Sequence, residues 1–188
     1  MSKGRLFVIT GPSGVGKGTL IRELFERVPG LELSVSATTR PSREGEWPGV
    51  DYHFLSEEDF SKRLEKGAFM EHASYSGHRY GTLLSEVEPR LARGAGVVLE
   101  IEVQGARQVR ERMPEAVLVF VAPPDPEVLR ERLEGRGTDT ADQIDRRLEV
   151  AREELDAQSE FAHVVVNDDV ERAADELARL VQGELASA

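Results

Sequence analysis

The chain has 188 residues, of which 39% are hydrophobic, and a formal net charge of −11 at pH 7. This length predicts one globular domain with a full core, while the acidic charge argues against nucleic-acid binding, which needs a basic surface. No apolar run approaches the ~20 residues of a membrane-spanning helix, and the lack of cysteine excludes disulfides and thiolate metal ligands. We therefore expect a cytoplasmic protein that binds neither nucleic acid nor membranes. No sequence feature specifies an oligomeric state.

The first predicted elements are a short buried strand, a glycine-rich loop and a helix. Residues 6–9 are apolar, residues 11–17 read Gly-Pro-Ser-Gly-Val-Gly-Lys, and the next apolar residues recur at helical spacing: Leu20, Ile21, Leu24 and Val28. Such glycines let backbone N–H groups point at an anion, and the helix dipole adds to the attraction. Lys17 would then reach the β- and γ-phosphates of a nucleotide. The alternative, a glycine-rich turn with a solvated lysine, is disfavoured because the strand and helix lie where phosphate binding requires them.

Position 18 departs from the usual phosphate-loop pattern. It is glycine, where the common motif has Ser or Thr to hold magnesium directly, and Thr19 comes one residue later. The run Gly-Lys-Gly-Thr resembles the loop of nucleoside monophosphate kinases, in which phosphates and water hold most of the metal. Because Mg²⁺ keeps its own waters readily, we expect Mg²⁺ to enter with ATP and assign it no protein ligand.

The stretch from residue 34 to residue 82 is predicted to be an insertion. A loop rich in Pro and Gly runs over residues 36–54 and carries Arg40 and Arg43. Ser56 is a predicted N-cap of a helix, and residues 69–73 predict a strand that a turn at residues 75–80 folds into a hairpin. These short elements differ from the α/β alternation on either side.

From residue 83 onward, predicted helices and strands alternate. Helices are expected over 83–93, 103–113, 126–134 and 170–185, with a long helix starting at 140–142, and strands over 97–102, 116–121 and 164–166. This alternation predicts an α/β fold, a mostly parallel sheet flanked by helices, with a small mixed or antiparallel insertion and a short lid. The expected parts are a core of residues 1–33, 83–132 and 148–188, the insertion 34–82 and a lid 133–147.

Several blocks in this order resemble guanylate kinases. They are Gly11–Lys17, Ser36-Ala-Thr-Thr-Arg-Pro-Ser-Arg43, Asp51-Tyr-His-Phe54, Tyr80-Gly81, Leu133-Glu-Gly-Arg-Gly-Thr138 and Val166-Asn-Asp-Asp169. The resemblance covers nearly the whole chain and is more specific than the phosphate loop alone. It implies a P-loop kinase that transfers the γ-phosphoryl group of ATP to GMP, giving ADP and GDP, and so supplies the precursor of GTP in purine metabolism.

The resemblance also implies roles for individual residues. The residues expected to bind ATP are Gly11, Pro12, Ser13, Gly14, Val15, Gly16, Lys17, Gly18, Thr19 and Asn167. Those expected to act on the transferring group are Lys17, Arg132, Arg136 and Arg147. Those expected to bind the GMP phosphate are Arg40, Arg43, Tyr52 and Tyr80, and those near the base are Ser36, Glu71, Thr82 and Glu102.

Base selection has a chemical reason at Glu71. Its carboxylate could accept from both the N1–H and the amino group of guanine, while the hydroxyls of Ser36 and Thr82 donate to O6; adenine would leave these groups unpaired. The alternative for Glu71 is an exposed strand carboxylate, and the motif context favours the functional role. Glu100 and Glu102 stand where the family often has aspartates, so each carboxylate is shifted outward by about one bond length.

Two other interpretations predict different sequences. A catalytically inactive guanylate-kinase-like module that binds phosphopeptides is expected to have a degraded phosphate loop, whereas this loop is intact apart from Gly18. A related kinase that acts on a phosphorylated sugar is expected to lack Glu71, Ser36 and Thr82, and all three are present.

Overall fold

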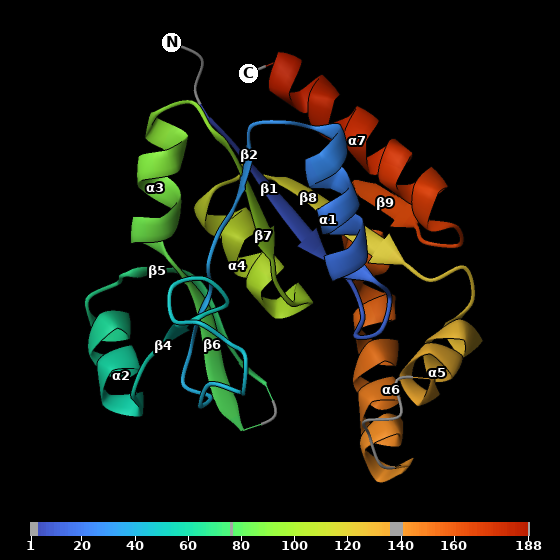
Figure 1. The fold of residues 1–188 in the computed structure, drawn as a ribbon, viewed down its shortest axis with the longest axis horizontal. Coiled ribbons are helices and arrows are strands. Elements are labelled where there is room, and N and C mark those ends of the chain that lie inside the picture. The colour runs from blue at the N-terminus through green and yellow to red at the C-terminus, as the bar shows by residue number, and fades with distance from the viewer. Residues whose placement is uncertain (1–3, 76, 136–140, 188) are drawn as a thin grey trace.

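The structure, a computed structural model, describes residues 4–75, 77–135 and 141–187 and centres on a five-stranded parallel sheet (Figure 1). The sheet order is β2-β7-β1-β8-β9. Its strands are β1 (Arg5–Thr10), β2 (Leu31–Leu33), β7 (Gly96–Glu100), β8 (Val117–Ala122) and β9 (His163–Val166). The helices of the core are α1 (Lys17–Arg27), α3 (Leu84–Ala92), α4 (Val103–Arg112), α5 (Pro126–Glu134), α6 (Ala141–Asp156) and α7 (Val170–Ala186), with a 3-10 turn at Ala157–Glu160.

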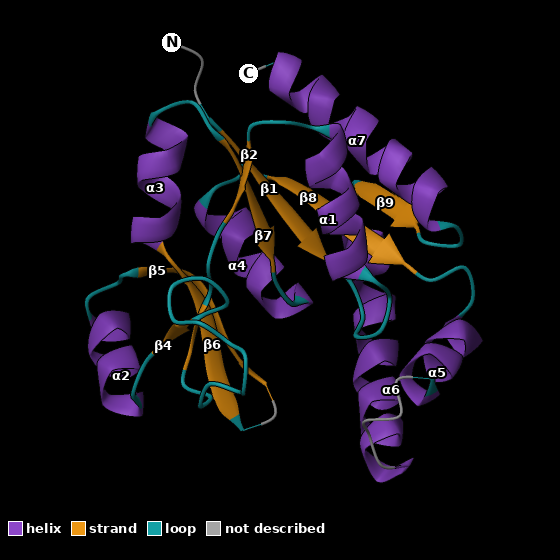
Figure 2. Cartoon of the chain, viewed as in Figure 1, coloured by secondary structure: helices purple, strands orange, loops and turns teal. Residues whose placement is uncertain are grey.

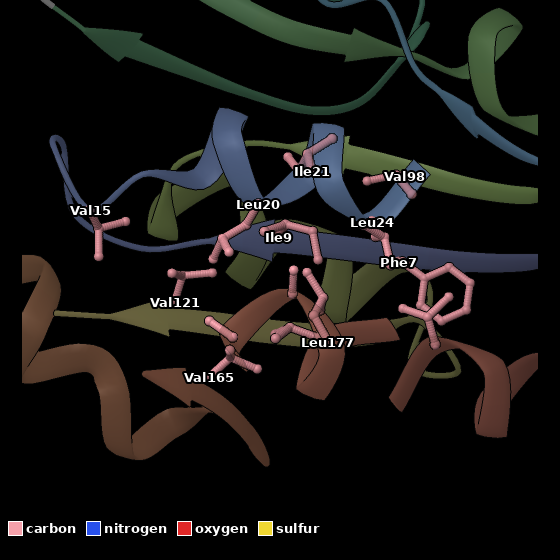
Figure 3. Packing of buried hydrophobic residues seen from close by; sticks show 14 of the residues in the cluster. Phe7, Ile9, Val15, Leu20, Ile21, Leu24, Val98, Val121, Val165 and Leu177 are labelled. Atoms are coloured by element: carbon pink, nitrogen blue, oxygen red, sulfur yellow. The ribbon is translucent and has the colours of Figure 1, made fainter. Parts of the chain in front are cut away.

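Both faces of the parallel sheet are covered because successive strand residues point to opposite sides. On one side, Phe7 and Ile9 of β1 pack between α1 and α7 in a cluster that includes Leu24 and Leu177 (Figure 3). On the other side, Leu6 and its neighbours in β1 and β7 pack against α3 and α4. The predicted α/β class with a mostly parallel sheet is confirmed.

The insertion forms a second sheet on one side of the core (Figure 2). Its strands, in the order β4-β3-β6-β5, are β3 (Ala37–Thr38), β4 (His53–Phe54), β5 (Phe69–Tyr75) and β6 (His78–Leu83). The β3–β4 pair is parallel and the other pairs are antiparallel, so this sheet is mixed. The helix α2 (Glu57–Glu65) covers it with Phe60, whose ring stacks on Phe69 at 4.4 Å between centroids.

Two helices begin with a side-chain cap of a residue type that favours this position. The Ser56 hydroxyl accepts from the Asp59 N–H at 3.0 Å at the start of α2, and the Asp125 carboxylate accepts from the Glu127 N–H at 2.9 Å at the start of α5. The chain leaves the main sheet after Leu33, at the end of β2, and joins the second sheet at Ala37, at the start of β3. Within the described ranges, no helix combines the length and apolarity that a bilayer crossing requires.

Candidate active site

A cleft of about 560 Å³ opens at the carboxyl ends of β1 and β7, where the main sheet faces the insertion. Ligands of open parallel sheets bind at this edge because loops that follow the strands meet there. The lining residues come from the glycine-rich loop, α1, the insertion and the turn after β7: Ser13, Gly14, Gly16, Lys17, Gly18, Thr19, Arg22, Leu33, Ser34, Ser36, Asp51, Tyr52, Glu100, Ile101 and Glu102. One cleft thus joins the two groups of residues that the sequence assigns to ATP and to GMP.

The glycine-rich loop has the conformation that phosphate binding requires. Gly14 and Gly16 have φ values of 86° and 97°, which side chains other than glycine rarely adopt. A Cβ at Gly11 would lie 2.2 Å from the carbonyl oxygen of Val121, so the loop passes directly against β8. The Lys17 ammonium donates to the carbonyls of Gly11 at 2.5 Å and Pro12 at 3.3 Å. No side chain caps the N-terminus of α1, which leaves its first N–H groups available to an anion.

Two side chains from distant parts of the chain hold the loop at Val15. The Asn167 amide, at the end of β9, donates to the Val15 carbonyl at 2.7 Å, and Arg132 on α5 donates to the same oxygen at 3.0 Å. Arg132 also donates to the Asn167 carbonyl at 3.0 Å. Asn167 is only 2% exposed. Both residues therefore fix the loop from the side of β9 and α5.

The Glu71 carboxylate is buried in the wall between β5, β6 and α4. It is 4% exposed and accepts from the Thr82 hydroxyl at 2.7 Å. Burial raises the pKa of Glu71 to about 6; the Thr82 hydrogen bonds oppose this, and the negative charge of Glu102 adds to it. Among the described residues, the groups that shift this pKa include no cation, and ligand N–H donors would satisfy the carboxylate.

The insertion places a cation opposite the loop. Arg40 makes a two-pronged ion pair with Glu46, at 3.0 and 2.8 Å, and Glu46 also accepts from the Arg43 N–H at 2.7 Å. The guanidinium lies 5.3 Å from the centre of the Tyr52 ring, and it also donates a hydrogen bond to the Tyr80 hydroxyl. The Arg43 side chain is exposed. A planar arginine held in this way suits a phosphate with two oxygens to offer.

The profile that describes guanylate kinase matches residues 3–184 of the chain. The guanylate kinase of Rubrobacter xylanophilus is 52% identical over 182 residues, which cover 97% of this chain and 95% of that protein. That of Synechococcus sp. strain CC9311 is 52% identical over 178 residues, 95% of this chain and 94% of that protein. The chain belongs to the guanylate kinase family. The crystal structure of guanylate kinase from Anaplasma phagocytophilum superposes with a TM-score of 0.80 at 32% identity, covering 98% of this chain and 87% of that one.

Membership confirms the expected class of enzyme, since guanylate kinases are ATP:GMP phosphotransferases. None of the comparisons supports the inactive phosphopeptide-binding alternative. Nine of the site residues that the sequence proposed line the cleft, namely Ser13, Gly14, Gly16, Lys17, Gly18, Thr19, Ser36, Tyr52 and Glu102. Arg136 lies outside the residues that the structure describes, so its proposed role stays a prediction. Arg147 on α6 is half-buried and hydrogen bonds Tyr75, whereas its neighbour Arg146 is exposed.

Sequence reasoning missed a carboxyl group, that of Glu154 on α6, which lies beside the cleft residue Glu102. It is 8% exposed, and its pKa is raised to about 9 because burial and the neighbouring Glu102 carboxylate disfavour its charge, while Lys17 and the Ser13 N–H oppose the shift. Glu46 was missed as well. Both lie among many acidic residues on helices and loops, and nothing in their spacing marks them; only the long-range fold brings Glu154 to Glu102.

The Glu100 carboxylate faces the start of α1 and fits a magnesium that arrives with a nucleotide. A Cβ at Gly18 would lie 3.9 and 4.0 Å from its two oxygens. Among the residues that the structure describes, no group of three or more His, Cys, Asp and Glu side chains could hold a metal ion. A single carboxylate beside phosphates and water is the environment in which Mg²⁺ commonly binds.

Replacing Asn167 with alanine is expected to lower the free energy of unfolding by about 1–3 kcal/mol, because one of the two hydrogen bonds to Val15 is lost inside the protein. The KM for ATP is expected to rise as the loop loosens. Thermal unfolding and steady-state kinetics at varied ATP measure the two effects. The matched control is Gln182→Ala, since Gln182 also donates to a backbone carbonyl, that of Arg27 at 3.4 Å, but is exposed. Equal stability of the Asn167 and Gln182 variants would contradict the loop-holding role.

Proposed function

We propose that this chain binds Mg²⁺-ATP at residues 11–19 and GMP between its insertion and α4, and that it transfers the γ-phosphoryl group across the shared cleft. One observation carries the proposal: a single cleft is lined by the phosphate loop with Lys17, by insertion residues that include Tyr52, and by Glu102. Two polyanions can meet only where a single cavity serves both.

The proposed transfer needs positioning more than proton chemistry. A phosphate oxygen of GMP, already ionised at neutral pH, attacks the γ-phosphorus as the bond to the β–γ bridging oxygen breaks, which gives GDP and ADP. Because negative charge is crowded between the two nucleotides, the site must supply cations. Lys17 serves the donor and Arg40 and Arg43 the acceptor. Arg132, Arg136 and Arg147 are the proposed lid-side cations.

Magnesium supplies charge neutralisation on the donor phosphates when it is bound. We assign it no protein ligand in this chain; the Glu100 carboxylate, which faces Gly18, would accept hydrogen bonds from its waters. Glu100 is exposed at the end of β7, but the surrounding cleft still removes water from its carboxylate and raises its pKa, while the positive charge of Lys17 opposes the rise. Lys17 thus favours the ionised form that such water contacts need.

The proposed mechanical parts are a core of residues 1–33, 83–132 and 148–188, a GMP-binding insertion of residues 34–82 and a lid of residues 133–147. Closure of the insertion and lid would exclude water from the transferring group. The proposed setting is purine metabolism in the cytoplasm, where the enzyme supplies the precursor of GTP. The charge of −11 also supports nucleotides, not nucleic acid, as its ligands.

Replacing Arg40 with lysine is expected to raise the KM for GMP about tenfold or more, because lysine cannot reproduce two parallel hydrogen bonds to a phosphate. The KM for ATP should stay unchanged. Steady-state kinetics with each nucleotide varied in turn provide the measurement. The matched control is Arg93→Lys, since Arg93 is an exposed arginine that pairs with Glu32 away from the cleft. An unchanged KM for GMP would reject the phosphate-binding role of Arg40.

The use of GMP is expected to weaken as the pH falls below about 6, the value to which burial raises the pKa of Glu71. Above that pH the carboxylate is ionised and accepts from both guanine donors, and below it a proton occupies one of the acceptor positions. The KM for GMP should then rise up to about tenfold per pH unit. A phosphate monoester also titrates near pH 6, so the Glu71→Gln variant, which keeps only the phosphate titration, is the control. Identical pH profiles for the two proteins would contradict the assignment.

Calorimetric titration tests the proposed division of the cleft into two sites. GMP and a non-hydrolysable ATP analogue with Mg²⁺ should each bind alone, and both should bind together. Arg40→Lys should weaken only GMP, and Lys17→Ala only the analogue. Competition between the two ligands for one site would overturn the proposal.

A further inference from the structure

The helix α4 holds the backbone of β5 on both sides of Glu71 through two side chains, Gln108 and Arg112. The Gln108 Oε1 accepts from the His72 N–H at 3.0 Å, and the Gln108 Nε2 donates to the His72 carbonyl at 2.6 Å. A third contact runs from Arg112 to the Phe69 carbonyl at 2.6 Å. Glu71 therefore lies between two backbone positions that α4 grips directly.

The fold explains why β5 needs this support. It is the edge strand of its sheet, and its register with β6 shifts between Phe69 and Glu71. An edge leaves backbone N–H and C=O groups without strand partners, and a register shift disrupts the ladder further. The Gln108 amide presents one acceptor and one donor side by side, as a neighbouring strand would. It thus replaces the missing partner at the residue that follows Glu71.

Gly105, one helical turn before Gln108, provides the space for the Glu71 carboxylate. A Cβ at Gly105 would lie 2.3 Å from Glu71 Oε2 and 3.0 Å from its Cδ, which is closer than non-bonded atoms approach. Alanine is a better helix former than glycine, but at this position of α4 its methyl group would displace the buried carboxylate.

The same helix is fixed in the core. Val103, Ala106 and Val109 of α4 are buried in the cluster that contains β1 and β7, and Met70 of β5 packs into that cluster too. The contacts that α4 makes with β5 therefore fix the position of Glu71 relative to the core sheet, which carries the phosphate loop. A carboxylate that accepts from two adjacent donors must be placed accurately, since a displacement of about 1 Å is enough to lower the activity of a site.

We propose that Gln108 and Gly105 are positioning residues that set the enzyme's selectivity for guanine by fixing the Glu71 carboxylate. This inference rests on the proposed function of Glu71 as the group that accepts from guanine. Neither residue is among those that line the cleft; Gln108 acts on the backbone next to Glu71, and Gly105 limits where its carboxylate can lie.

The test compares GMP with IMP as acceptors. Hypoxanthine keeps O6 and N1–H but lacks the 2-amino group, so the ratio of kcat/KM for GMP to that for IMP measures the second hydrogen bond to Glu71. Gln108→Ala and Gly105→Ala are each expected to reduce that ratio about tenfold or more, with a raised KM for GMP and an unchanged KM for ATP. The controls are Gln182→Ala and Gly183→Ala on α7, where an added Cβ at Gly183 meets no atom within 4 Å.

Each outcome has one interpretation. A general loss of stability lowers the use of both acceptors alike, so an unchanged ratio in the Gln108 and Gly105 variants overturns the inference, whatever their thermal unfolding temperatures. If Glu71→Gln reduces the ratio and these variants do not, only the inference fails. If Glu71→Gln itself leaves the ratio unchanged, the proposed role of Glu71 fails and the inference fails with it.

Discussion

Replacing Lys17 with alanine is expected to lower kcat about 10²–10³-fold while the affinity for GMP stays unchanged. The side chain is the one cation that the phosphate loop itself supplies, and its ammonium lies on the loop carbonyls of Gly11 and Pro12, beside the helix N-terminus. During transfer, negative charge shifts toward the β–γ bridging oxygen, and a fixed positive charge there stabilises the transition state more than the bound substrate. The proposed acceptor site is built from insertion residues and does not depend on this charge.

The measurement combines the rate of ADP formation with calorimetric binding of GMP. Lys17→Met keeps part of the aliphatic stem and separates loss of charge from loss of packing; both variants should fall to a similar rate. Lys62→Ala is the control, because Lys62 is an exposed lysine of α2 that pairs with Glu58. Turnover of the Lys17 variants at the rate of the unaltered enzyme would reject the donor-site assignment.

Replacing Glu71 with glutamine is expected to lower kcat/KM for GMP about 10²-fold or more, with the KM for ATP unchanged. The change is nearly isosteric, but it turns one acceptor into an N–H₂ donor that faces the donors of guanine. It also places a buried amide beside the Thr82 hydroxyl. Because both groups are buried, water cannot replace the hydrogen bonds that the amide fails to make. The cost therefore appears when guanine binds.

Glu65→Gln provides the control, since Glu65 is an exposed carboxylate at the end of α2 in the same insertion. Kinetics with GMP and ATP varied separately distinguish acceptor from donor effects. Equal losses for both nucleotides would contradict the base-reading role, because they would indicate general damage to the fold.

The parts of the site that could be predicted from sequence are those that local chemistry determines. The phosphate loop is recognisable because its glycines, lysine, strand and helix are contiguous, and Gly14 and Gly16 adopt the positive φ values that only glycine tolerates well. The caps at Ser56 and Asp125 are predictable for the same reason, since each contact spans two or three residues.

The parts that could not be predicted depend on contacts between distant segments. The binding of ATP by Asn167 stays a prediction, whereas its amide contact with the Val15 carbonyl, 152 residues away in the chain, could not be predicted. The Gln108 contact with His72 and the approach of Glu154 to Glu102 likewise arise only when α4, α6 and the insertion are assembled. In each case the residue type permits many partners, and tertiary packing selects one.

The most direct test of the account is ADP formation from Mg²⁺-ATP with GMP, AMP, CMP and UMP supplied side by side as acceptors. The account predicts rapid turnover with GMP and, for AMP, a kcat/KM lower by about 10⁴-fold, because adenine leaves the Glu71 carboxylate and its neighbours unpaired. Comparable turnover with AMP would contradict the guanine assignment, and binding of GMP without turnover would contradict the kinase itself.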